Sequence, residues 1–334
     1  MTKKCLGCGI TLQNIDKLGL GYCPKDIKEA IYCERCFKII HYNKINVVTL
    51  PKDNSNIISI VNNKALYTFF LIDFLNINTE TIAKFKEITT PKTLIISKCD
   101  VIPKSIKLNK ISNYLQKEYD IADNILFISC KKDKNLSRIV NILEKEKVKT
   151  AYIMGFTNVG KSTLINALYE KYTSSKSRIT TSLIPNTTLD FIMVKINDDL
   201  TLVDTPGFIL NNSFYQTDDI SLIKRIEPKN YLKPITYQCN KLMYLNIEDK
   251  IFLKINNKSN SLTFYLSNEL KIKKSFKSCI KDFNLKLEID DNSDIIIKGL
   301  GFINVKKATT IEIMLEGPEI IEVRNSIFED DKGK

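Results

Sequence analysis

The chain has 334 residues, of which 43% are hydrophobic and 26% are charged. That balance is ordinary for globular proteins, so it excludes a wholly disordered chain and leaves room for two or three domains. No apolar run approaches the ~18 residues that a membrane-spanning helix requires. The first four residues lead to Cys5 without the apolar core of a secretion signal. We therefore expect a cytoplasmic protein that does not associate with membranes.

The formal net charge of +12 favours a polyanionic partner such as nucleic acid. The alternative is a lysine- and asparagine-rich surface that has no binding role. The sequence contains no dense arginine patch, so that alternative stays open.

Four of the nine cysteines form two Cys-x-x-Cys pairs, Cys5 with Cys8 and Cys33 with Cys36. Two turns that each present two thiolates can complete a tetrahedral zinc site, in which metal binding supplies the folding energy. Residues 1–45 lack the apolar periodicity for a core of their own, so we predict a Cys₄ zinc module there. Cys23 is an alternative ligand.

Between residues 64 and 154, buried-strand patterns alternate with amphipathic stretches, which is typical of a mostly parallel sheet covered by helices. The predicted strands are 65–72, 93–96, 125–128 and 151–154, and the predicted helices are 79–89, 104–119 and 135–148. A helix over 161–172 and a strand pair at 191–196 and 201–203 are expected next.

Residues 155–162 fit the eight-residue phosphate-loop pattern in full, between a predicted strand and a predicted helix. Backbone N–H groups and a helix N-terminus suit phosphate oxygens. Lys161 would reach the β- and γ-phosphates, and Ser162 would coordinate Mg²⁺. The loop residues expected to bind nucleotide are Gly155, Asn158, Val159, Gly160, Lys161, Ser162 and Thr163.

Two further segments have the pattern of nucleotide switches. In Asp204-Thr-Pro-Gly207, Asp204 would hold Mg²⁺ and the Gly207 N–H would sense the γ-phosphate. Residues 185–188 supply hydroxyls for a switch that closes over Mg²⁺, with Thr188 the first choice and Thr187 the second. The alternative for 185–188 is a solvated threonine-rich loop.

Two more motifs predict that the base is guanine. In Ser97-Lys98-Cys99-Asp100, the carboxylate would accept hydrogen bonds from guanine N1–H and the 2-amino group, a donor pair that adenine lacks. The Lys98 stem can pack on the base. In Ser129-Cys130-Lys131, backbone N–H groups could meet the guanine oxygen while the lysine stacks on the other side.

The order of these motifs is reversed, because Asp100 and Lys131 precede the phosphate loop rather than follow it. Chain termini often lie close together, so the same sheet can be cut and rejoined elsewhere. We therefore predict an α/β, circularly permuted P-loop GTPase domain over 46–215. Residues 210–232 are predicted to be a switch region and linker. Domain 216–334 is predicted to be β-rich, with strands at 241–246, 250–255, 262–266, 294–298 and 310–315.

Position 208 is Phe, which cannot orient an attacking water, so slow turnover stimulated by a partner or an ion is expected. Asn158 suggests activation by K⁺, which would neutralise charge between phosphates. The alternative is that Asn158 only fixes the conformation of the loop. The residues predicted to act in hydrolysis are Lys161, Thr188, Gly207 and Asn158.

Taken together, the chain resembles the YqeH family of circularly permuted, ribosome-biogenesis GTPases over roughly residues 1–210. It departs from the family at Ser97, at Asn186 and in a short C-terminal region. The motifs that carry the resemblance are Cys5-x-x-Cys8-Gly9, Gly21-Tyr22 with Pro24-Lys25, Tyr32-Cys33-x-Arg35-Cys36-Phe37 with His41-Tyr42-Asn43, Lys98-x-Asp100, Thr157–Asn166, Pro185-x-Thr-Thr-Leu-Asp190 and Asp204–Gly207.

From the motifs we expect a monomeric GTPase that uses GTP/GDP, Mg²⁺ and Zn²⁺. The resemblance implies a role in assembling the small ribosomal subunit, contacts with rRNA and release controlled by GTP. Two alternatives stay open. One is a nucleotide-gated RNA-binding module with negligible turnover, and the other is a related permuted GTPase that acts on the large subunit.

Overall fold

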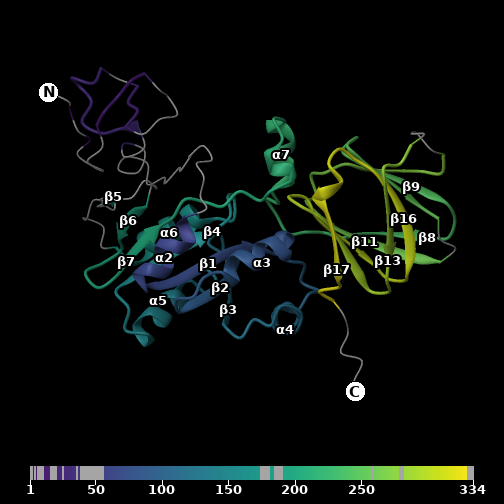
Figure 1. Ribbon diagram of the computed structural model, residues 1–334, viewed down its shortest axis with the longest axis horizontal. Helices are drawn as coiled ribbons and strands as arrows, with labels where there is room; N and C mark the ends of the chain where they lie inside the picture. The colour runs from purple at the N-terminus through teal and green to yellow at the C-terminus, as the bar shows by residue number, and fades with distance from the viewer. Residues whose placement is uncertain are drawn as a thin grey trace. The chain divides into compact units, whose positions relative to one another are not determined.

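The computed structural model describes residues 3, 5, 11–15, 21–24, 26–34, 37, 56–173, 181–183, 191–256, 259–277 and 282–328. The chain divides into two compact units, each assembled from separate stretches of sequence (Figure 1). The first unit comprises Met1–Ile72, Ala83–Lys98 and Asp123–Ile209, and the second comprises Asp73–Ile82, Cys99–Ala122 and Leu210–Lys334.

A seven-stranded sheet in the order β3-β2-β1-β4-β7-β6-β5 forms the centre of the first unit. Pairs β2–β3, β1–β4 and β4–β7 are parallel, whereas β5–β6 and β6–β7 are antiparallel. The strands are β1 (Tyr67–Asp73), β2 (Lys92–Ser97), β3 (Asn124–Phe127), β4 (Thr150–Gly155), β5 (Thr181–Leu183), β6 (Ile192–Lys195) and β7 (Thr201–Asp204).

Burial explains why these segments become strands. Every residue of β1 is buried, as expected for a parallel strand covered on both faces. Helices α2 (Ile57–Lys64), α5 (Leu136–Lys145) and α6 (Lys161–Tyr172) belong to this unit, and α3 (Thr79–Lys86) spans the division between the two units. In α5, the buried residues Leu136, Ile139 and Leu143 recur at helical spacing, so one face packs on the core.

The predicted strands and helices of residues 65–172 and the strand pair before Asp204 are confirmed. Helix α2 and strand β5 were not predicted. The predicted linker over 210–232 also contains structure: 3₁₀ helix η2 (Phe214–Gln216) and helix α7 (Ile220–Ile226). The Asp219 side chain caps α7 by accepting a hydrogen bond from the Leu222 N–H at 2.9 Å.

Two five-stranded antiparallel sheets make up most of the second unit, in the orders β12-β9-β10-β16-β13 and β17-β14-β15-β11-β8. Alternate residues of β9, β10 and β11 are buried, so each sheet turns one face to a shared core. The strands are β8 (Ile235–Cys239), β9 (Met243–Ile247), β10 (Ile251–Ile255), β11 (Asn260–Leu266), β12 (Ile272–Ser275), β13 (Leu285–Ile289), β14 (Ser293–Ile297), β15 (Gly301–Val305), β16 (Thr309–Met314) and β17 (Ile321–Asn325).

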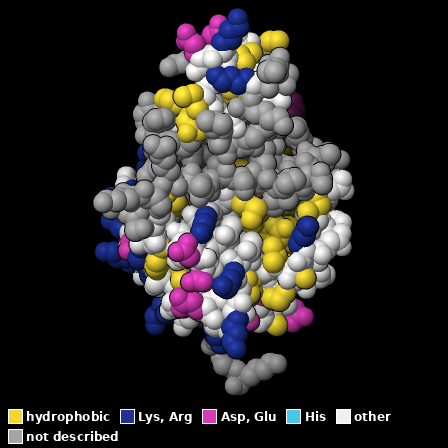
Figure 2. All heavy atoms as spheres, turned by 90° about the vertical axis from the view of Figure 1, so that its left-hand side faces the viewer, with side chains coloured by type: hydrophobic (Ala, Val, Ile, Leu, Met, Phe, Trp, Pro, Cys, Tyr) yellow, Lys and Arg dark blue, Asp and Glu magenta, His cyan; other side chains and the backbone are white. Residues whose placement is uncertain are grey.

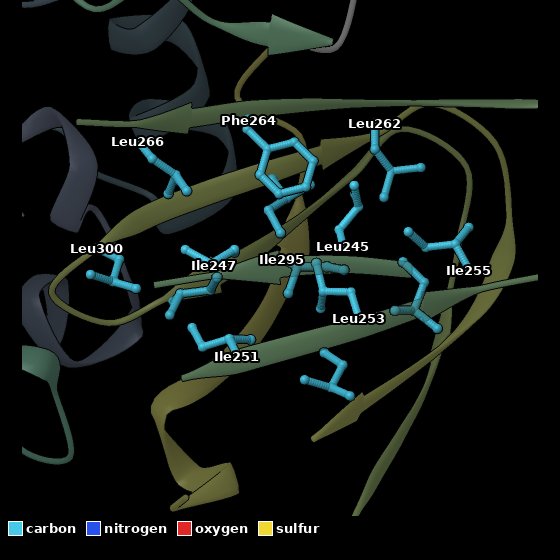
Figure 3. Close-up of a cluster of buried hydrophobic side chains, with 14 of the residues drawn as sticks. Leu245, Ile247, Ile251, Leu253, Ile255, Leu262, Phe264, Leu266, Ile295 and Leu300 are labelled. Atoms are coloured by element: carbon cyan, nitrogen blue, oxygen red, sulfur yellow. The ribbon is translucent and has the colours of Figure 1, made fainter. Parts of the chain in front are cut away.

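Figure 3 shows this core, in which Leu245, Leu253 and Ile255 of one sheet face Leu262 and Phe264 of the other. The β-rich domain expected from the sequence is therefore confirmed. Strands β8, β12, β13, β15 and β17 were not among those predicted.

Two inserted segments of the second unit pack on these sheets. The first contains 3₁₀ helix η1 (Phe74–Asn76), and the second contains α4 (Leu108–Tyr119). The ring of Phe74 packs edge-on against Phe302 with centroids 5.4 Å apart, and the Gly299 N–H donates to Asn76 Oδ1 at 3.1 Å. Segments that interrupt the sequence of the seven-stranded sheet are thus built into the C-terminal β domain.

Candidate nucleotide-binding site

The phosphate loop connects β4 to α6, as the sequence predicts. Gly155 has φ 142°, and a Cβ atom there would lie 2.3 Å from the Leu71 carbonyl oxygen of β1. Gly160 has φ 97° at the N-cap of α6. Gly155 therefore requires glycine both for its backbone conformation and because Leu71 approaches closely. Gly160 requires glycine for its backbone conformation alone.

Lys161 is the first residue of α6, and its side chain folds back over the loop. Its Nζ donates to the carbonyl oxygens of Gly155 at 3.1 Å and Phe156 at 3.0 Å. Burial lowers the pKa of Lys161, while the Asp204 carboxylate opposes that shift. An ammonium beside a carboxylate and the loop backbone is placed to pair with phosphate oxygens.

Asp204 ends β7 and is buried, with 2% of its surface exposed. Ser162, the other predicted magnesium ligand in the described residues, is half-buried in the first turn of α6. A hydroxyl and a carboxylate are the oxygen donors that Mg²⁺ accepts, so these two residues fit the ion chemically. Thr187 and Thr188 lie outside the described residues.

Phe208 is paired with the phosphate loop, and a Cβ atom at Gly207 would lie 2.8 Å from Lys161 Nζ. The Thr157 N–H donates to the Phe208 carbonyl at 2.8 Å, and the Phe208 N–H donates to the Gly155 carbonyl at 3.1 Å. The Phe208 ring is 6% exposed and packs against Phe156 with centroids 5.7 Å apart. A buried ring cannot position water, which agrees with the expectation for position 208.

Ser97 joins the guanine motif to the phosphate loop. Its Oγ lies 2.7 Å from the Val159 carbonyl and 3.1 Å from the Ile72 carbonyl. One hydroxyl proton serves both acceptors, and the shorter contact is with the loop. The sequence predicts Ser97 as part of the base-reading motif and as a departure from the family, but not its contact with Val159, 62 positions away.

The other base-reading residues follow the carboxyl ends of β2 and β3. Lys98 has φ 53°, and Asp100 lies in the turn that follows and belongs to the second unit. After β3, the Ser129 and Lys134 backbones pair in both directions, at 3.2 and 2.9 Å, and enclose Cys130 and Lys131 in a turn. Neighbouring parallel strands end at one edge of a sheet, so the segments that follow β2 and β3 begin at the same edge, where Ser97 contacts the loop.

Two of the four predicted zinc ligands are described. Cys5 and Cys33 are buried, and the Cys33 N–H donates to Cys5 Sγ at 3.2 Å. Cys23 is buried in the same cluster. Within the described part of the chain, no group of three or more His, Cys, Asp or Glu side chains is arranged to hold a metal ion. Cys8 and Cys36 lie outside that part, and a sulfur that accepts a backbone N–H fits thiolate ligation.

None of the helices in the described part of the chain has the length and apolarity needed to span a bilayer. A glycine-constrained phosphate loop, a buried aspartate at the end of the neighbouring strand and a base motif that comes earlier in the chain define a circularly permuted P-loop GTPase fold.

Comparison with known proteins agrees with that class. The family described as "50S ribosome-binding GTPase" matches residues 150–273. A Bacillus subtilis protein, "Uncharacterized protein YqeH", is 32% identical over 246 residues, which cover 71% of this chain and 67% of that protein. The chain belongs to the YqeH family of circularly permuted ribosome-biogenesis GTPases.

More distant relatives include plant proteins. "NO-associated protein 1, chloroplastic/mitochondrial" of Arabidopsis thaliana is 25% identical over 71% of this chain. The chain spans about half of that protein, 49% of its length. Among solved structures, YjeQ from Thermotoga maritima is similar over 43% of this chain and 48% of its own, with 23% identity and a TM-score of 0.31.

Proposed function

We propose that the protein binds and hydrolyses GTP and, in a nucleotide-dependent way, binds rRNA during assembly of the small ribosomal subunit. The observation that carries this proposal is the hydrogen bond of 2.7 Å between Ser97 Oγ and the Val159 carbonyl. It ties the segment that precedes Asp100 to the phosphate loop, which supports a single nucleotide site built from both motifs despite their reversed order.

The proposed roles follow from the chemistry of each group. Asp100 accepts the guanine N–H donors, Lys161 pairs with the β- and γ-phosphates, and the Gly207 N–H detects the γ-phosphate. Mg²⁺ would supply positive charge that offsets the charge developing on the phosphates. Ser162, Asp204 and Thr188 are the residues that would hold it.

Zinc would be held by the four cysteines of the N-terminal module. The bond from the Cys33 N–H to Cys5 Sγ supports this, because it brings one member of each Cys-x-x-Cys pair together. Such a closed site is structural, and chelation is expected to unfold the module without acting on the nucleotide site directly.

A second candidate is a nucleotide-gated RNA-binding module with negligible turnover. The buried Phe208 ring favours it, since the described segment after Gly207 offers no side chain at that position to orient water. A third candidate is a GTPase that acts on the large subunit, which is supported by the match to the family described as "50S ribosome-binding GTPase".

One experiment separates these candidates. The protein is sedimented with isolated small or large ribosomal subunits under GDP, a non-hydrolysable GTP analogue or no nucleotide, and phosphate release is followed over multiple turnovers in the same mixtures. We expect analogue-dependent co-sedimentation with the small subunit and faster release in its presence. Co-sedimentation with the large subunit alone, or no turnover with either, would reject the proposal in favour of the corresponding alternative.

Asp100→Ala tests the base reader in the same assay. Loss of charged hydrogen bonds is expected to weaken GTP binding about 10- to 100-fold while leaving the weak binding of ATP unchanged. Asp199→Ala is the matched control, because this carboxylate is exposed in the turn between β6 and β7 and pairs only with Lys149 among the contacts described. Equal GTP affinity for both variants would refute the role of Asp100.

A further inference from the structure

An exposed aromatic ring with two lysine ammonium groups over it lies at one corner of the β domain. Phe276 follows β12 directly and is 50% exposed. Lys241 Nζ lies 4.1 Å and Lys274 Nζ 5.1 Å from its ring centroid. Lys274 Nζ is also 6.0 Å from the ring of Tyr237. Together with Leu242, which is 38% exposed, these residues are called the Phe276 patch.

The patch lies where the two sheets have free edges. Strand β12 is the edge of one sheet, and β8, which carries Tyr237, is the edge of the other. Lys241 comes from the connection between β8 and β9. Because the Lys274 ammonium is close to both the Tyr237 ring and the Phe276 ring, the two edge strands contribute to one surface.

The two segments at this corner are rich in lysine, since residues 235–247 and 272–277 contain four lysines and no Asp or Glu. Glu248 and Asp249 follow directly, and Lys273 forms an ion pair with Asp249 at 2.8 Å. Lys241 and Lys274 have no carboxylate partner among the described contacts and lie over aromatic rings, and Lys274 is also close enough to Cys239 to oppose the rise in the pKa of that thiol that burial causes. On the face shown in Figure 2, basic and acidic side chains are interspersed, so the net charge of the chain does not by itself mark a binding surface.

Protection of sheet edges accounts for lysines on β12 but not for the rest of the patch. An edge needs charge alone, whereas this corner also exposes Phe276 and Leu242. The same domain offers a contrast in Lys254, which lies 5.6 Å from the Phe283 ring but is paired with Glu312 at 2.8 Å. A paired lysine can be structural, whereas Lys241 and Lys274, which have no carboxylate partner among the residues that the structure describes, are available to a ligand over an exposed ring.

We propose that the Phe276 patch is a contact site for single-stranded RNA, in which a base stacks on the Phe276 ring while Lys241 and Lys274 pair with the flanking phosphates. Any base can stack on an aromatic face, and lysines that follow the backbone give affinity without sequence preference. The proposal rests on the proposed function, since it identifies where the rRNA binds.

The first test measures affinity for a fluorescent single-stranded oligoribonucleotide at several salt concentrations. Phe276→Ala is expected to weaken binding about tenfold. Lys241→Ala/Lys274→Ala is expected to reduce the salt slope by about 1.4, since each phosphate contact to a single strand contributes about 0.7. Lys250→Ala/Lys286→Ala is the matched control, because it removes the same charge from exposed positions of the same domain. Equal loss in both double variants would overturn the site.

The second test uses the absence of tryptophan from the chain. Phe276→Trp places a single fluorophore in the patch, and stacking on a base is expected to quench its emission as RNA is added. Val323→Trp is the control and should not be quenched, because this exposed residue lies on β17, the edge of its sheet opposite β8. Absence of quenching at position 276, or equal quenching of both variants, would overturn the proposal.

Unchanged GTP hydrolysis and circular dichroism show that each variant is folded. If the unaltered chain binds no RNA, the RNA-binding part of the proposed function fails together with the site. If the patch variants bind RNA as tightly as the unaltered chain does, only the proposed RNA site is rejected. Loss of binding to phosphatidylserine vesicles, with RNA binding retained, would assign the patch to a membrane surface instead.

Discussion

Asn158 occupies the one non-glycine position of the phosphate loop that has a left-handed backbone, with φ 63°. Asn tolerates this region better than most residues, although glycine adopts it at lower cost. If only the backbone conformation mattered, glycine would suit position 158 as well as it suits position 160. An exposed carboxamide kept at such a position is consistent with a ligand for K⁺ beside the phosphates.

Two substitutions separate the backbone role of Asn158 from the ligand role. Asn158→Gly keeps the left-handed conformation and removes the carboxamide, whereas Asn158→Ala removes both. We expect hydrolysis by the unaltered protein to be faster in K⁺ than in Na⁺, and both variants to lose that preference. The measurement is multiple-turnover phosphate release in each salt. Retention of the K⁺ preference by Asn158→Gly would show that only the loop conformation matters.

Much of the site can be read from sequence because phosphate-loop chemistry depends on local spacing. Gly155, Lys161 and Asp204 are found by pattern, and the burial of Phe208 agrees with its lack of a polar group. The contact of Ser97 with Val159 could not be found in this way, because it joins residues that are adjacent only after the sheet has formed. A serine in a sequence also does not indicate which carbonyl group its hydroxyl will contact.

A buried ion pair links elements of the second unit. Arg324 of β17 donates to Asp294 of β14, with Nη2 3.2 Å from Oδ2, and its Nη1 donates to the Ile77 carbonyl. Its guanidinium lies 4.9 Å from the Phe302 ring and 5.7 Å from the Tyr114 ring of α4. One side chain therefore contacts two strands of the β domain and both inserted segments.

Arg324→Met tests how much this pair contributes to the second unit. Burial raises the pKa of Asp294, and Arg324 opposes that shift. Removing the arginine should cost about 3–5 kcal/mol at neutral pH, because a buried carboxylate is left without its cation. Since a folded-state pKa above the unfolded one favours folding as pH falls, the deficit should shrink between pH 7 and pH 5. Amide exchange in β14 and β17 reports this unit separately.

The matched controls lie in the same domain. Asp294→Asn/Arg324→Met removes both charges and is expected to recover part of the loss, with no pH dependence from this site. Lys229→Met breaks the exposed pair with Glu269 and should change stability little. A deficit for Arg324→Met that is equal at pH 5 and pH 7 would show that its packing, rather than the pair, is what matters.

Elements were predicted well where burial produces a continuous apolar run or a helical period, as in β1, β4 and α6. Four of the five strands that were missed in the β domain are edge strands, namely β8, β12, β13 and β17, whereas the fifth, β15, is central and mostly buried. In β12 two adjacent lysines are exposed, in β13 Lys286 and Glu288 are exposed, and β8 is mostly exposed. Edge strands are covered on fewer sides, so their sequences hold less of the signal on which prediction depends.

At the scale of the whole molecule, residues 207–215 lead from Gly207, which we propose to sense the γ-phosphate, into the second unit. Phe208 pairs with the phosphate loop, and the division between units falls just after Ile209. Beyond it, the Phe214 N–H donates to the Lys298 carbonyl at 3.1 Å, and Asn76 Nδ2 donates to the Tyr215 hydroxyl at 3.2 Å. Within the second unit, hydrogen bonds therefore hold the segment that follows Ile209 to the β domain and to the η1 segment.

We therefore expect the arrangement of the two units to depend on the nucleotide, because contact between the γ-phosphate and Gly207 competes with the pairing of Phe208 to the loop. Solution scattering should give different curves for the GDP-bound and GTP-analogue-bound protein. Tyr215→Phe removes the acceptor of the Asn76 bond and should reduce that difference without changing nucleotide affinity. Superimposable curves for the unaltered protein would mean that hydrolysis is not transmitted through this segment, and control of ribosomal binding would then have to depend on the switch at residues 185–188.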